Sequence, residues 1–161
     1  MSEYALSLGS NVGNRLGNIR RAVYMLGLSG RSITAKSGVY ETPPWGLEEQ
    51  PRFLNACVLL DADIRPRELL AAAKDIEREI GRKTRERWGP REIDIDILTC
   101  GSLLLAEDGL SIPHPSMFER AFVLVPLSDI ADRWKHPSLG ATVGEMLAKT
   151  GCDGIVRVTS L

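Results

Sequence analysis

The stretch from Arg87 to Leu98, RWGPREIDIDIL, places two aspartates one step apart directly after a run of arginines. In a β-strand Asp94 and Asp96 project from the same face, about 6.5–7 Å apart along the backbone. Neighbouring carboxylates repel and raise each other's pKa unless a cation compensates. Mg²⁺ prefers oxygen ligands, often one or two carboxylates together with substrate phosphates. The spacing therefore predicts metal ligands at Asp94 and Asp96, for one ion or for two ions about 3.5–4 Å apart.

The segment that precedes this strand is strongly basic. Residues 82–91, RKTRERWGPR, contain the cations Arg82, Lys83, Arg85, Arg87 and Arg91. Guanidinium groups bind phosphate oxygens in pairs and stay charged at any relevant pH. Carboxylates for a metal beside arginines for phosphate suit a metal–nucleoside triphosphate, whose reactions need positioning and charge neutralisation. The alternative is an exposed sheet face on which aspartates simply pair with arginines, and the local chemistry leaves both interpretations open.

Hydrophobic periodicity predicts the elements that would position these residues. Strands are expected at residues 4–10, 32–42 and 53–63 and in the segment IDIDIL, and helices are expected after Asn14 and after Pro66. The order β-α-β-β-α-β predicts an α+β fold, the ferredoxin-like βαββαβ sandwich. A hairpin within residues 103–112, a short helix near Met146 and a last strand IVRV would form a C-terminal extension. We expect one stand-alone domain over residues 1–161.

Composition narrows the class of protein. The chain has 161 residues, 43% of them hydrophobic, and a formal net charge of −1, which argues against a general nucleic-acid binder. We find neither an apolar run of about 20 residues, as a membrane span needs, nor a secretory signal. Cys57, Cys100 and Cys152 have no paired spacing, which suits a reducing compartment. We therefore expect a cytoplasmic, monomeric protein that binds small molecules rather than nucleic acid or membranes.

The stretch RWGPREIDIDIL resembles the signature of the 6-hydroxymethyl-7,8-dihydropterin pyrophosphokinases, enzymes of folate biosynthesis. Further blocks follow the order of that family, namely LGSNVGNR, YETPPWG, QPRFLNA, IEREIGR and IPHPSMFERAFVL. The resemblance implies a ferredoxin-like α+β enzyme that transfers the β,γ-pyrophosphoryl group of ATP to the hydroxymethyl oxygen of the pterin and releases AMP. It also implies two Mg²⁺ ions bridged by Asp94 and Asp96.

The same resemblance implies roles for other residues around the nucleotide. Matching positions for phosphate or nucleotide contacts are Arg82, Arg91, Trp88, His114, Arg120 and Lys74. The second loop arginine of the family corresponds to Arg85 or to Lys83. Glu77 would stabilise the loop or the neighbouring arginines, or would simply be solvated. By its chemistry alone, His114 between two prolines is equally well a rigid turn residue, and Pro115 stands where some relatives carry an aromatic residue.

For the pterin, the matching positions are Thr42, Pro43, Pro44, Trp45, Phe53, Asn55 and Phe122. Aromatic side chains such as Phe53 and Phe122 could stack on a flat heterocycle, although core packing is the usual role of isolated aromatics. The amide of Asn55 offers both a donor and an acceptor. A site that hydrogen-bonds a polar ring can reject analogues that lack those groups.

Two other classes of function stay open at the level of residue chemistry. A non-catalytic ferredoxin-like module could bind a nucleotide, another small ligand or RNA, because fold alone does not fix function. That reading leaves the acid pair without a role. A nucleotidyltransferase could use the same metal pair and release pyrophosphate, and only the family resemblance argues against it.

Overall fold

The computed structural model describes residues 2–44, 49–82 and 89–161. Its elements, in chain order, are β1 (Ser2–Ser10), α1 (Arg15–Leu26), β2 (Ser32–Lys36), β3 (Gly38–Thr42), β4 (Phe53–Ala62), α2 (Pro66–Ile80), β5 (Asp94–Cys100), β6 (Leu105–Glu107), β7 (Leu110–Ile112), the 3₁₀ turn η1 (Met117–Glu119), α3 (Ala121–Ala131), α4 (Val143–Thr150) and β8 (Val156–Ser160).

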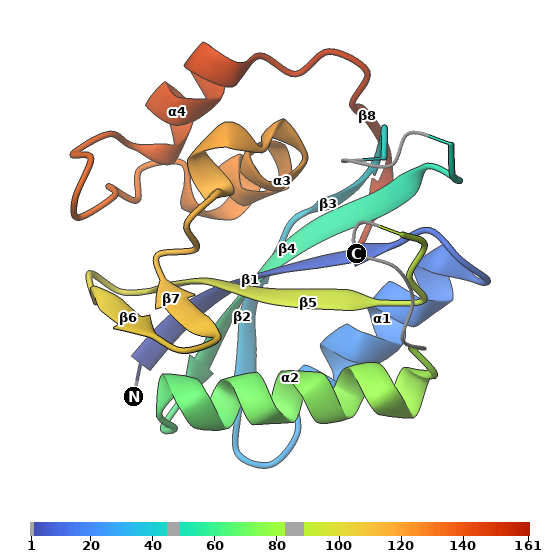
Figure 1. The fold of residues 1–161 in the computed structure, drawn as a ribbon, viewed down its shortest axis with the longest axis horizontal. Helices are drawn as coiled ribbons and strands as arrows, with labels where there is room; N and C mark the ends of the chain where they lie inside the picture. Colours follow the sequence, from blue (N-terminus) through green and yellow to red (C-terminus); the bar gives the residue numbers. More distant parts are fainter. Residues whose placement is uncertain (1, 45–48, 83–88) are drawn as a thin grey trace.

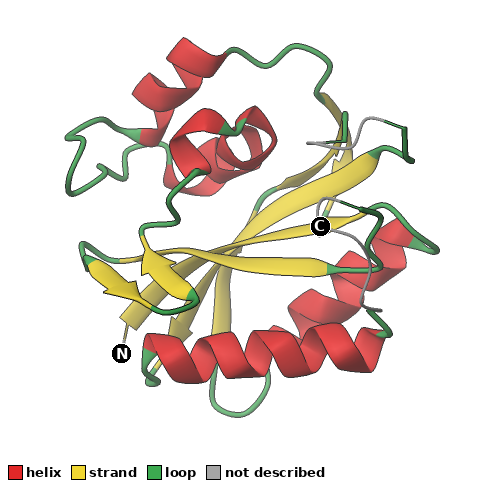
Figure 2. Ribbon diagram, viewed as in Figure 1, coloured by secondary structure: helices red, strands yellow, loops and turns green. Residues whose placement is uncertain are grey.

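The strands form one antiparallel six-stranded sheet and a separate hairpin. The order in the sheet is β5-β1-β4-β3-β8, with β2 also paired to β4, and β6 pairs with β7. Helices α1 and α2 cover one face of the sheet, whereas α3 and α4 lie over the other face (Figures 1 and 2). The predicted ferredoxin-like core is confirmed, since β5, β1, β4 and the β2–β3 region carry its strand order. Strand β8 and the α3–α4 layer extend it.

Helix starts follow the signals in the sequence. The side chain of Asn14 accepts a hydrogen bond from the N–H of Gly17 at 2.9 Å, so it caps α1 as predicted. Helix α2 begins at Pro66 and ends at Gly81, which has a φ of 105°, a conformation that glycine adopts without penalty. This end of α2 leads directly into Arg82 and the basic segment.

One prediction of secondary structure was wrong, and one helix was not predicted. Residues 32–42 were expected to be one strand, but they form β2 and β3, separated at the buried Ser37. The Ser37 hydroxyl accepts from the N–H of Cys57 at 2.8 Å, which gives the break an internal hydrogen bond. Helix α3 was not anticipated, because Pro126 interrupts its apolar sequence, although proline is compatible with the helix once tertiary packing supports it.

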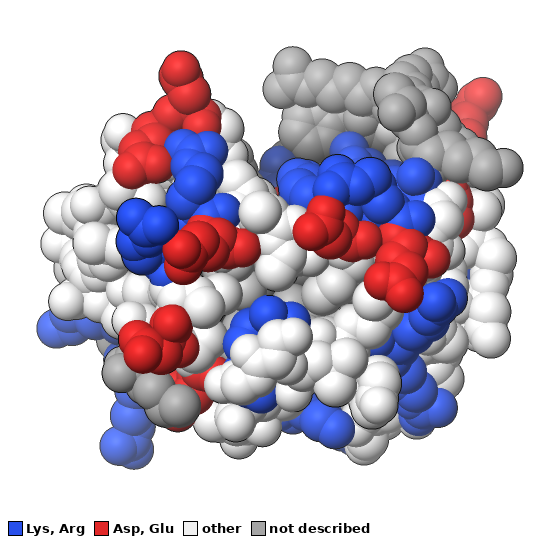
Figure 3. All heavy atoms as spheres, turned by 90° about the horizontal axis from the view of Figure 1, so that it is seen from below, with Lys and Arg blue, Asp and Glu red and all other residues white. Residues whose placement is uncertain are grey.

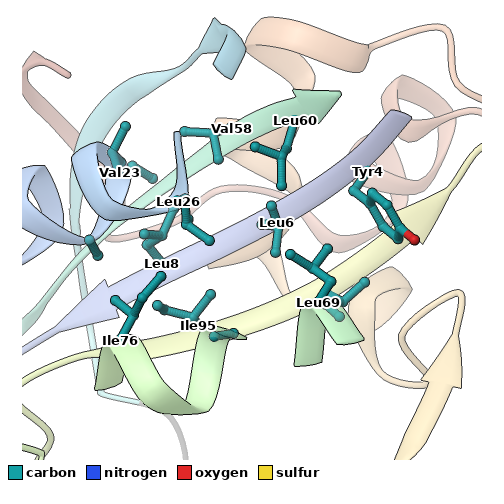
Figure 4. Close-up of a cluster of buried hydrophobic side chains, with 14 of the residues drawn as sticks. Tyr4, Leu6, Leu8, Val23, Leu26, Val58, Leu60, Leu69, Ile76 and Ile95 are labelled. Carbon is teal, nitrogen blue, oxygen red and sulfur yellow. The ribbon is translucent and has the colours of Figure 1, made fainter. Parts of the chain in front are cut away.

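The alternation of the strands divides the molecule into two hydrophobic clusters. On the α1–α2 face, Leu6 and Leu8 of β1 pack with Ile95 of β5 and with residues of both helices, including Leu26 and Ile76 (Figure 4). On the opposite face a second cluster packs against α3 and α4, and its members include Ala5, Cys57, Leu98, Val123, Leu124, Leu127 and Met146. Side chains of β1 and β5 that point to the α3 side of the sheet, beyond this second cluster, are therefore available for a site.

The surface carries charges of both signs. In the view of Figure 3, Lys and Arg side chains alternate with Asp and Glu side chains instead of forming one extended basic face. Within residues 2–44, 49–82 and 89–161, none of the helices combines the length and the apolar character needed to cross a membrane.

Candidate functional site

The acid pair lies on the face of β5 that the alternation predicts. Asp94 pairs with Gly9 of β1 and Asp96 pairs with Ser7, so both carboxylates stand on the face toward α3. Their neighbours Ile93, Ile95 and Ile97 are at most 4% exposed and lie in the cluster on the α1–α2 face. The strand thus presents two acids on one side while its other side anchors it in the core.

Two arginines form ion pairs with Asp94. Arg82 Nη1 lies 3.0 Å from Asp94 Oδ1, and Arg91 Nη1 lies 2.6 Å from Asp94 Oδ2. The three side chains are about a quarter exposed or less, so these ion pairs are stronger than those of a fully solvated surface. Asp94 thus pairs with arginines, as the alternative interpretation expected, but in a partly buried place and not on an exposed sheet face. This pairing does not oppose the phosphate hypothesis, because the same guanidinium groups border the site.

Asp96 has a more deeply perturbed environment. Burial and the nearby charge of Asp94 raise the pKa of Asp96 to about 7, although Arg120 opposes this shift. Such a carboxyl group gains from a cation that lowers the cost of its ionisation. The surroundings of Asp96 therefore favour a nearby cation.

His114 is held as a neutral ring. Burial and the charge of Arg120 lower the pKa of His114 to about 4. Its Nδ1 accepts from the backbone N–H of Ser116 at 3.2 Å, so the ring proton is on Nε2. His114 is consequently a neutral hydrogen-bond donor at physiological pH, and not a general base already paired with a carboxylate.

A pocket over the sheet, the aromatic pocket, contains most of the predicted pterin residues. It is lined by Ser7, Gly9, Thr42, Pro43, Phe53, Asn55, Gly89, Arg91, Asp94, Asp96, Arg120 and Phe122. Asn55 Nδ2 donates to Thr42 Oγ1 at 2.6 Å, which fixes the orientation of the amide. The Arg120 guanidinium carbon lies 5.7 Å from the centre of the Phe122 ring, within the range of a cation–π contact. The pocket thus offers aromatic faces and an oriented amide beside the acids.

A second cavity, the hairpin pocket, lies on the other side of Asp96. It has a volume of about 290 Å³ and is lined by Leu70, Lys74, Ile95, Asp96, Ile97, Glu107, Gly109, Leu110, Ser111, His114 and Pro115. Its walls come from α2, β5 and the β6–β7 hairpin. Asp96 lines both pockets. Two ligands bound in the two pockets would therefore meet at Asp96.

The acid pair fits a metal that shares its coordination with a substrate. In the described part of the chain, no group of three or more His, Cys, Asp and Glu side chains is placed to hold an ion. Asp94 and Asp96 supply hard oxygen donors, and Mg²⁺ commonly takes one or two carboxylates and completes its shell with phosphate and water. The donor set suits Mg²⁺ that arrives with a phosphate ligand better than a fully enclosed structural ion.

The remaining predicted residues divide into three groups. Arg82 contacts both Asp94 and Glu77, and its Nη1 lies 2.9 Å from Glu77 Oε2. Of the alternatives for Glu77, a place beside the neighbouring arginines agrees with the structure, whereas a solvated side chain does not, because Glu77 is only 3% exposed. Pro44 is described but lines neither of the two pockets. The residues Trp45, Trp88, Arg85 and its alternative Lys83 lie outside the described residues.

Sequence reasoning assigned no role to Asn11, which joins three segments at the border of the site. Its Oδ1 accepts from the N–H of Arg91 at 2.8 Å, and its own N–H donates to the Arg91 carbonyl at 3.0 Å. Its Nδ2 donates to Gln50 Oε1 and to the Pro51 carbonyl, each at 2.9 Å. Asn11 belongs to the block LGSNVGNR, and that membership was the only signal for it in the sequence.

Gly9 was also overlooked as a site residue. It lies between Asn55 of β4 and Asp94 of β5 in the sheet. A Cβ atom at this position would stand 2.7 Å from Asn55 Oδ1 and 3.5 Å from Phe53 Cδ1. The absence of a side chain at Gly9 therefore keeps the floor of the aromatic pocket open.

An antiparallel α+β sheet that presents paired carboxylates and arginines where two pockets adjoin has the features of a phosphoryl-transfer site. The comparison with protein families identifies the group more closely. The chain belongs to the family described as 7,8-dihydro-6-hydroxymethylpterin-pyrophosphokinase (HPPK), whose model matches residues 5–132.

Individual relatives agree with this assignment. The 2-amino-4-hydroxy-6-hydroxymethyldihydropteridine pyrophosphokinase of Methylorubrum extorquens is 43% identical over 98% of this chain and 99% of its own length. The mitochondrial folate synthesis bifunctional protein of Arabidopsis thaliana is 46% identical over 80% of this chain, and the match spans only 23% of that protein. The fold is similar to that of the HPPK-DHPS protein of Plasmodium falciparum, with a TM-score of 0.74, 18% identity and coverage of 92% of this chain and 42% of that one.

Proposed function

We infer that this chain transfers the pyrophosphoryl group of ATP to the hydroxymethyl group of 6-hydroxymethyl-7,8-dihydropterin and releases AMP, as a step of folate biosynthesis. Family membership supports the reaction. The observation that carries the proposal is the position of Asp96, which lines the aromatic pocket and the hairpin pocket together. This arrangement brings an acceptor in one pocket and a triphosphate from the other to the same carboxylates.

The aromatic pocket is proposed as the pterin site. Phe53 and Phe122 offer ring faces on which the flat heterocycle can stack. The Asn55 amide, oriented by Thr42, pairs with the polar edge of the ring, and Pro43 closes one side. Since the amide supplies both a donor and an acceptor, the pocket selects for a ring edge with the complementary groups. Pro44 and Trp45 are also proposed to belong to this site, because they match the family motif. Pro44 is one of the described residues, and Trp45 is not.

The hairpin pocket is proposed as the nucleotide site. Leu70, Ile97 and Leu110 give it an apolar wall suited to a base, and Lys74 and His114 add donors for phosphate oxygens. Arg120 lies close enough to lower the pKa of His114, so these two side chains share one electrostatic environment. In this proposal the triphosphate extends from the hairpin pocket toward Asp96, and Trp88 and Arg85 of the basic segment also contact it.

The acid pair is proposed to hold two Mg²⁺ ions, through Asp94 and Asp96. When bound there, Mg²⁺ would neutralise charge on the triphosphate. Arg82, Arg91 and Arg120 donate to phosphoryl oxygens and stabilise the charge that develops during transfer. The chain's further contribution is to align the hydroxymethyl oxygen with the β-phosphorus.

The reaction needs no reactant other than ATP and the pterin. The pterin hydroxymethyl oxygen bonds to the β-phosphorus of ATP, the bond from the β-phosphorus to the oxygen that bridges it to the α-phosphorus breaks, and AMP leaves. The hydroxyl proton is released. Since His114 is neutral with its proton on Nε2, it is suited to donate a hydrogen bond to phosphate rather than to accept that proton.

We further propose a monomer in the cytoplasm. Residues of a single chain line both pockets, so the site does not need a partner subunit. Cys57, Cys100 and Cys152 are all free thiols, as a reducing compartment would keep them.

The test is to incubate the purified protein with ATP, Mg²⁺ and 6-hydroxymethyl-7,8-dihydropterin and to separate the nucleotide products. Pterin-dependent AMP, without ADP or free pyrophosphate as primary products, is the expected result. ADP would identify a simple kinase, and free pyrophosphate would identify a nucleotidyltransferase. Binding of ATP with no product would make the protein a ligand-binding module and would overturn the proposal.

A further inference from the structure

The aromatic pocket takes part of its lining from the fork at which β3 and β4 separate. The ladder between these strands ends at the pair Thr42–Phe53, and residues 43–52 connect them. Thr42, Pro43, Phe53 and Asn55 all line the pocket. A strand ladder opens most readily at its ends. The pocket residues at this fork therefore depend on support from outside the two strands.

Arg15 bridges the two sides of the fork with one guanidinium nitrogen. Its Nη1 donates to Glu41 Oε2 of β3 at 3.0 Å and to the carbonyl of Arg52, the residue before β4, also at 3.0 Å. The side chains of Arg15 and Glu41 are 33% and 34% exposed, so their ion pair is partly shielded from water. One cation thus ties the end of β3 to the start of β4.

The bridge lies on the face of the sheet opposite to the pocket. Tyr40 and Thr42, the neighbours of Glu41 in β3, point toward the α3 side. The Tyr40 hydroxyl donates to Asp129 of α3 at 2.7 Å, and Thr42 lines the pocket. Because side chains alternate along a strand, Glu41 points to the other face, where α1 lies (Figure 1). Arg15 therefore supports the fork from behind and is not among the residues that line the pocket.

The base of the bridge is itself held in place. Arg15 is the first residue of α1, and Asn14 caps this helix. Four residues of α1 are buried in the cluster on the α1–α2 face, namely Ile19, Ala22, Val23 and Leu26. A guanidinium is planar and has its donors in fixed directions, so it restricts the positions of both acceptors.

We propose that Arg15 is a positioning residue for the pterin, which acts through its bridge between Glu41 and the Arg52 carbonyl. This inference rests on the proposed function. The bridge holds Thr42 and Phe53 in the arrangement that the heterocycle needs, whereas Arg15 contacts neither substrate. Because the nucleotide is proposed to bind in the hairpin pocket, the effect of the bridge should be confined to the pterin.

The substitution Arg15→Met removes the guanidinium and keeps most of the aliphatic side chain. A hydrogen bond to a charged group changes an equilibrium constant by about 10-fold or more, and partial exposure reduces this effect. We expect KM for the pterin to rise about 4-fold to 15-fold, with KM for ATP and kcat within about twofold of the wild type. Arg15→Lys keeps the charge without the planar fork, so its KM for the pterin should be intermediate. Arg21→Met is the matched control, because Arg21 is an exposed arginine on the same helix.

The substitution Glu41→Gln tests the bridge from its other end. It keeps the shape of the side chain and removes its charge, so KM for the pterin should rise about 3-fold to 5-fold. The variant with both substitutions should match Arg15→Met alone within about 1.5-fold, since both changes disrupt one bridge. Losses that multiply would overturn the proposal. Should Arg15→Met fail to fold, a wild-type KM for the pterin in Glu41→Gln would overturn it, and a raised one would support it.

Hydrogen exchange gives a measurement that does not depend on activity. Backbone amides at the ends of β3 and β4 should exchange faster in Arg15→Met than in the wild type, whereas those of β5 should not change. Unchanged exchange, a wild-type KM for the pterin, or an equal rise in KM for ATP would each overturn the proposal. Absence of AMP formation by the wild-type protein is a separate outcome. It would reject the proposed function, and the exchange measurement would still show whether Arg15 holds the fork.

Discussion

Substitution of Gly9 by alanine should damage the aromatic pocket without destabilising the fold. The φ of Gly9 is not in the left-handed region, so alanine is compatible with the backbone there. Its Cβ would stand 2.7 Å from Asn55 Oδ1, where ordinary contacts begin at 3.4 Å. The amide must therefore give way by the difference, 0.7 Å, although its Nδ2 is held by Thr42 at 2.6 Å.

The magnitude follows from the hydrogen bonds at stake. A displaced amide cannot keep both its bond to Thr42 and its proposed bonds to the pterin, and a lost buried hydrogen bond costs about 1–3 kcal/mol. That cost corresponds to an increase of about 5-fold to 150-fold in KM for the pterin. The alanine also restricts the unfolded chain, which favours folding by about 0.4–1 kcal/mol and partly offsets the clash. The KM for the pterin should thus rise while the melting temperature changes little.

The assay is pterin-dependent AMP formation over a range of pterin concentrations, with a thermal melt of each variant. Gly27→Ala is the matched control, because the φ of Gly27 is −79° and no atom lies closer than 3.5 Å to its new Cβ. A Gly9→Ala protein whose KM for the pterin is within twofold of the wild type would refute the role assigned to Asn55. A drop in melting temperature with no change in KM would show that Gly9 serves packing alone.

Three further predictions concern the acids and Asn11. Asp94→Ala and Asp96→Ala should each lower kcat at least about 100-fold at saturating Mg²⁺, in a protein that still melts cooperatively, and normal turnover would reject the metal assignment. The folded pKa of Asp96, about 7, lies above its ordinary value of 3.8, so the folded metal-free protein holds this proton more tightly than the unfolded chain does. Asp96 therefore favours folding most at low pH, and this contribution to stability is lost as the pH rises to about 7. In urea unfolding, the Asp96→Asn variant should be more stable than the wild type at pH 8, and this difference should shrink toward pH 4.5. An equal difference at both pH values would contradict this environment for Asp96. Asn11→Ala should lower the free energy of unfolding by about 1–3 kcal/mol, because the N–H of Arg91 loses its acceptor, and should also lower kcat, because Arg91 then holds Asp94 less firmly. Unfolding curves and rates measured on the same preparation would show both effects, and an unchanged kcat would separate Asn11 from the site.

The sequence was informative wherever a local pattern determines structure. Alternation in IDIDIL was sufficient to place Asp94 and Asp96 on one face, because a strand has a period of two residues. The helix that follows Asn14 and the one that begins at Pro66 have local start signals of the same kind. Helix α3 has no such signal, since its apolar residues run almost without interruption and include Pro126.

The parts of the site that escaped prediction depend on contacts between distant segments. Asn11 and Arg91 are 80 residues apart, and no spacing in the sequence indicates that one holds the other. Gly9 matters because of Asn55, its neighbour on another strand. Such pairings become visible only when the sheet order and the helix packing are known.

The paired arginines on Asp94 have a consequence for the order in which ligands can bind. Arg82 and Arg91 each pair with one oxygen of the same carboxylate, so both guanidinium groups are already engaged before a phosphate group arrives. A divalent ion that occupies Asp94 would compete with both guanidinium groups and release them toward the incoming phosphates. Competition for the single side chain of Asp94 would then favour metal-loaded nucleotide over metal-free nucleotide.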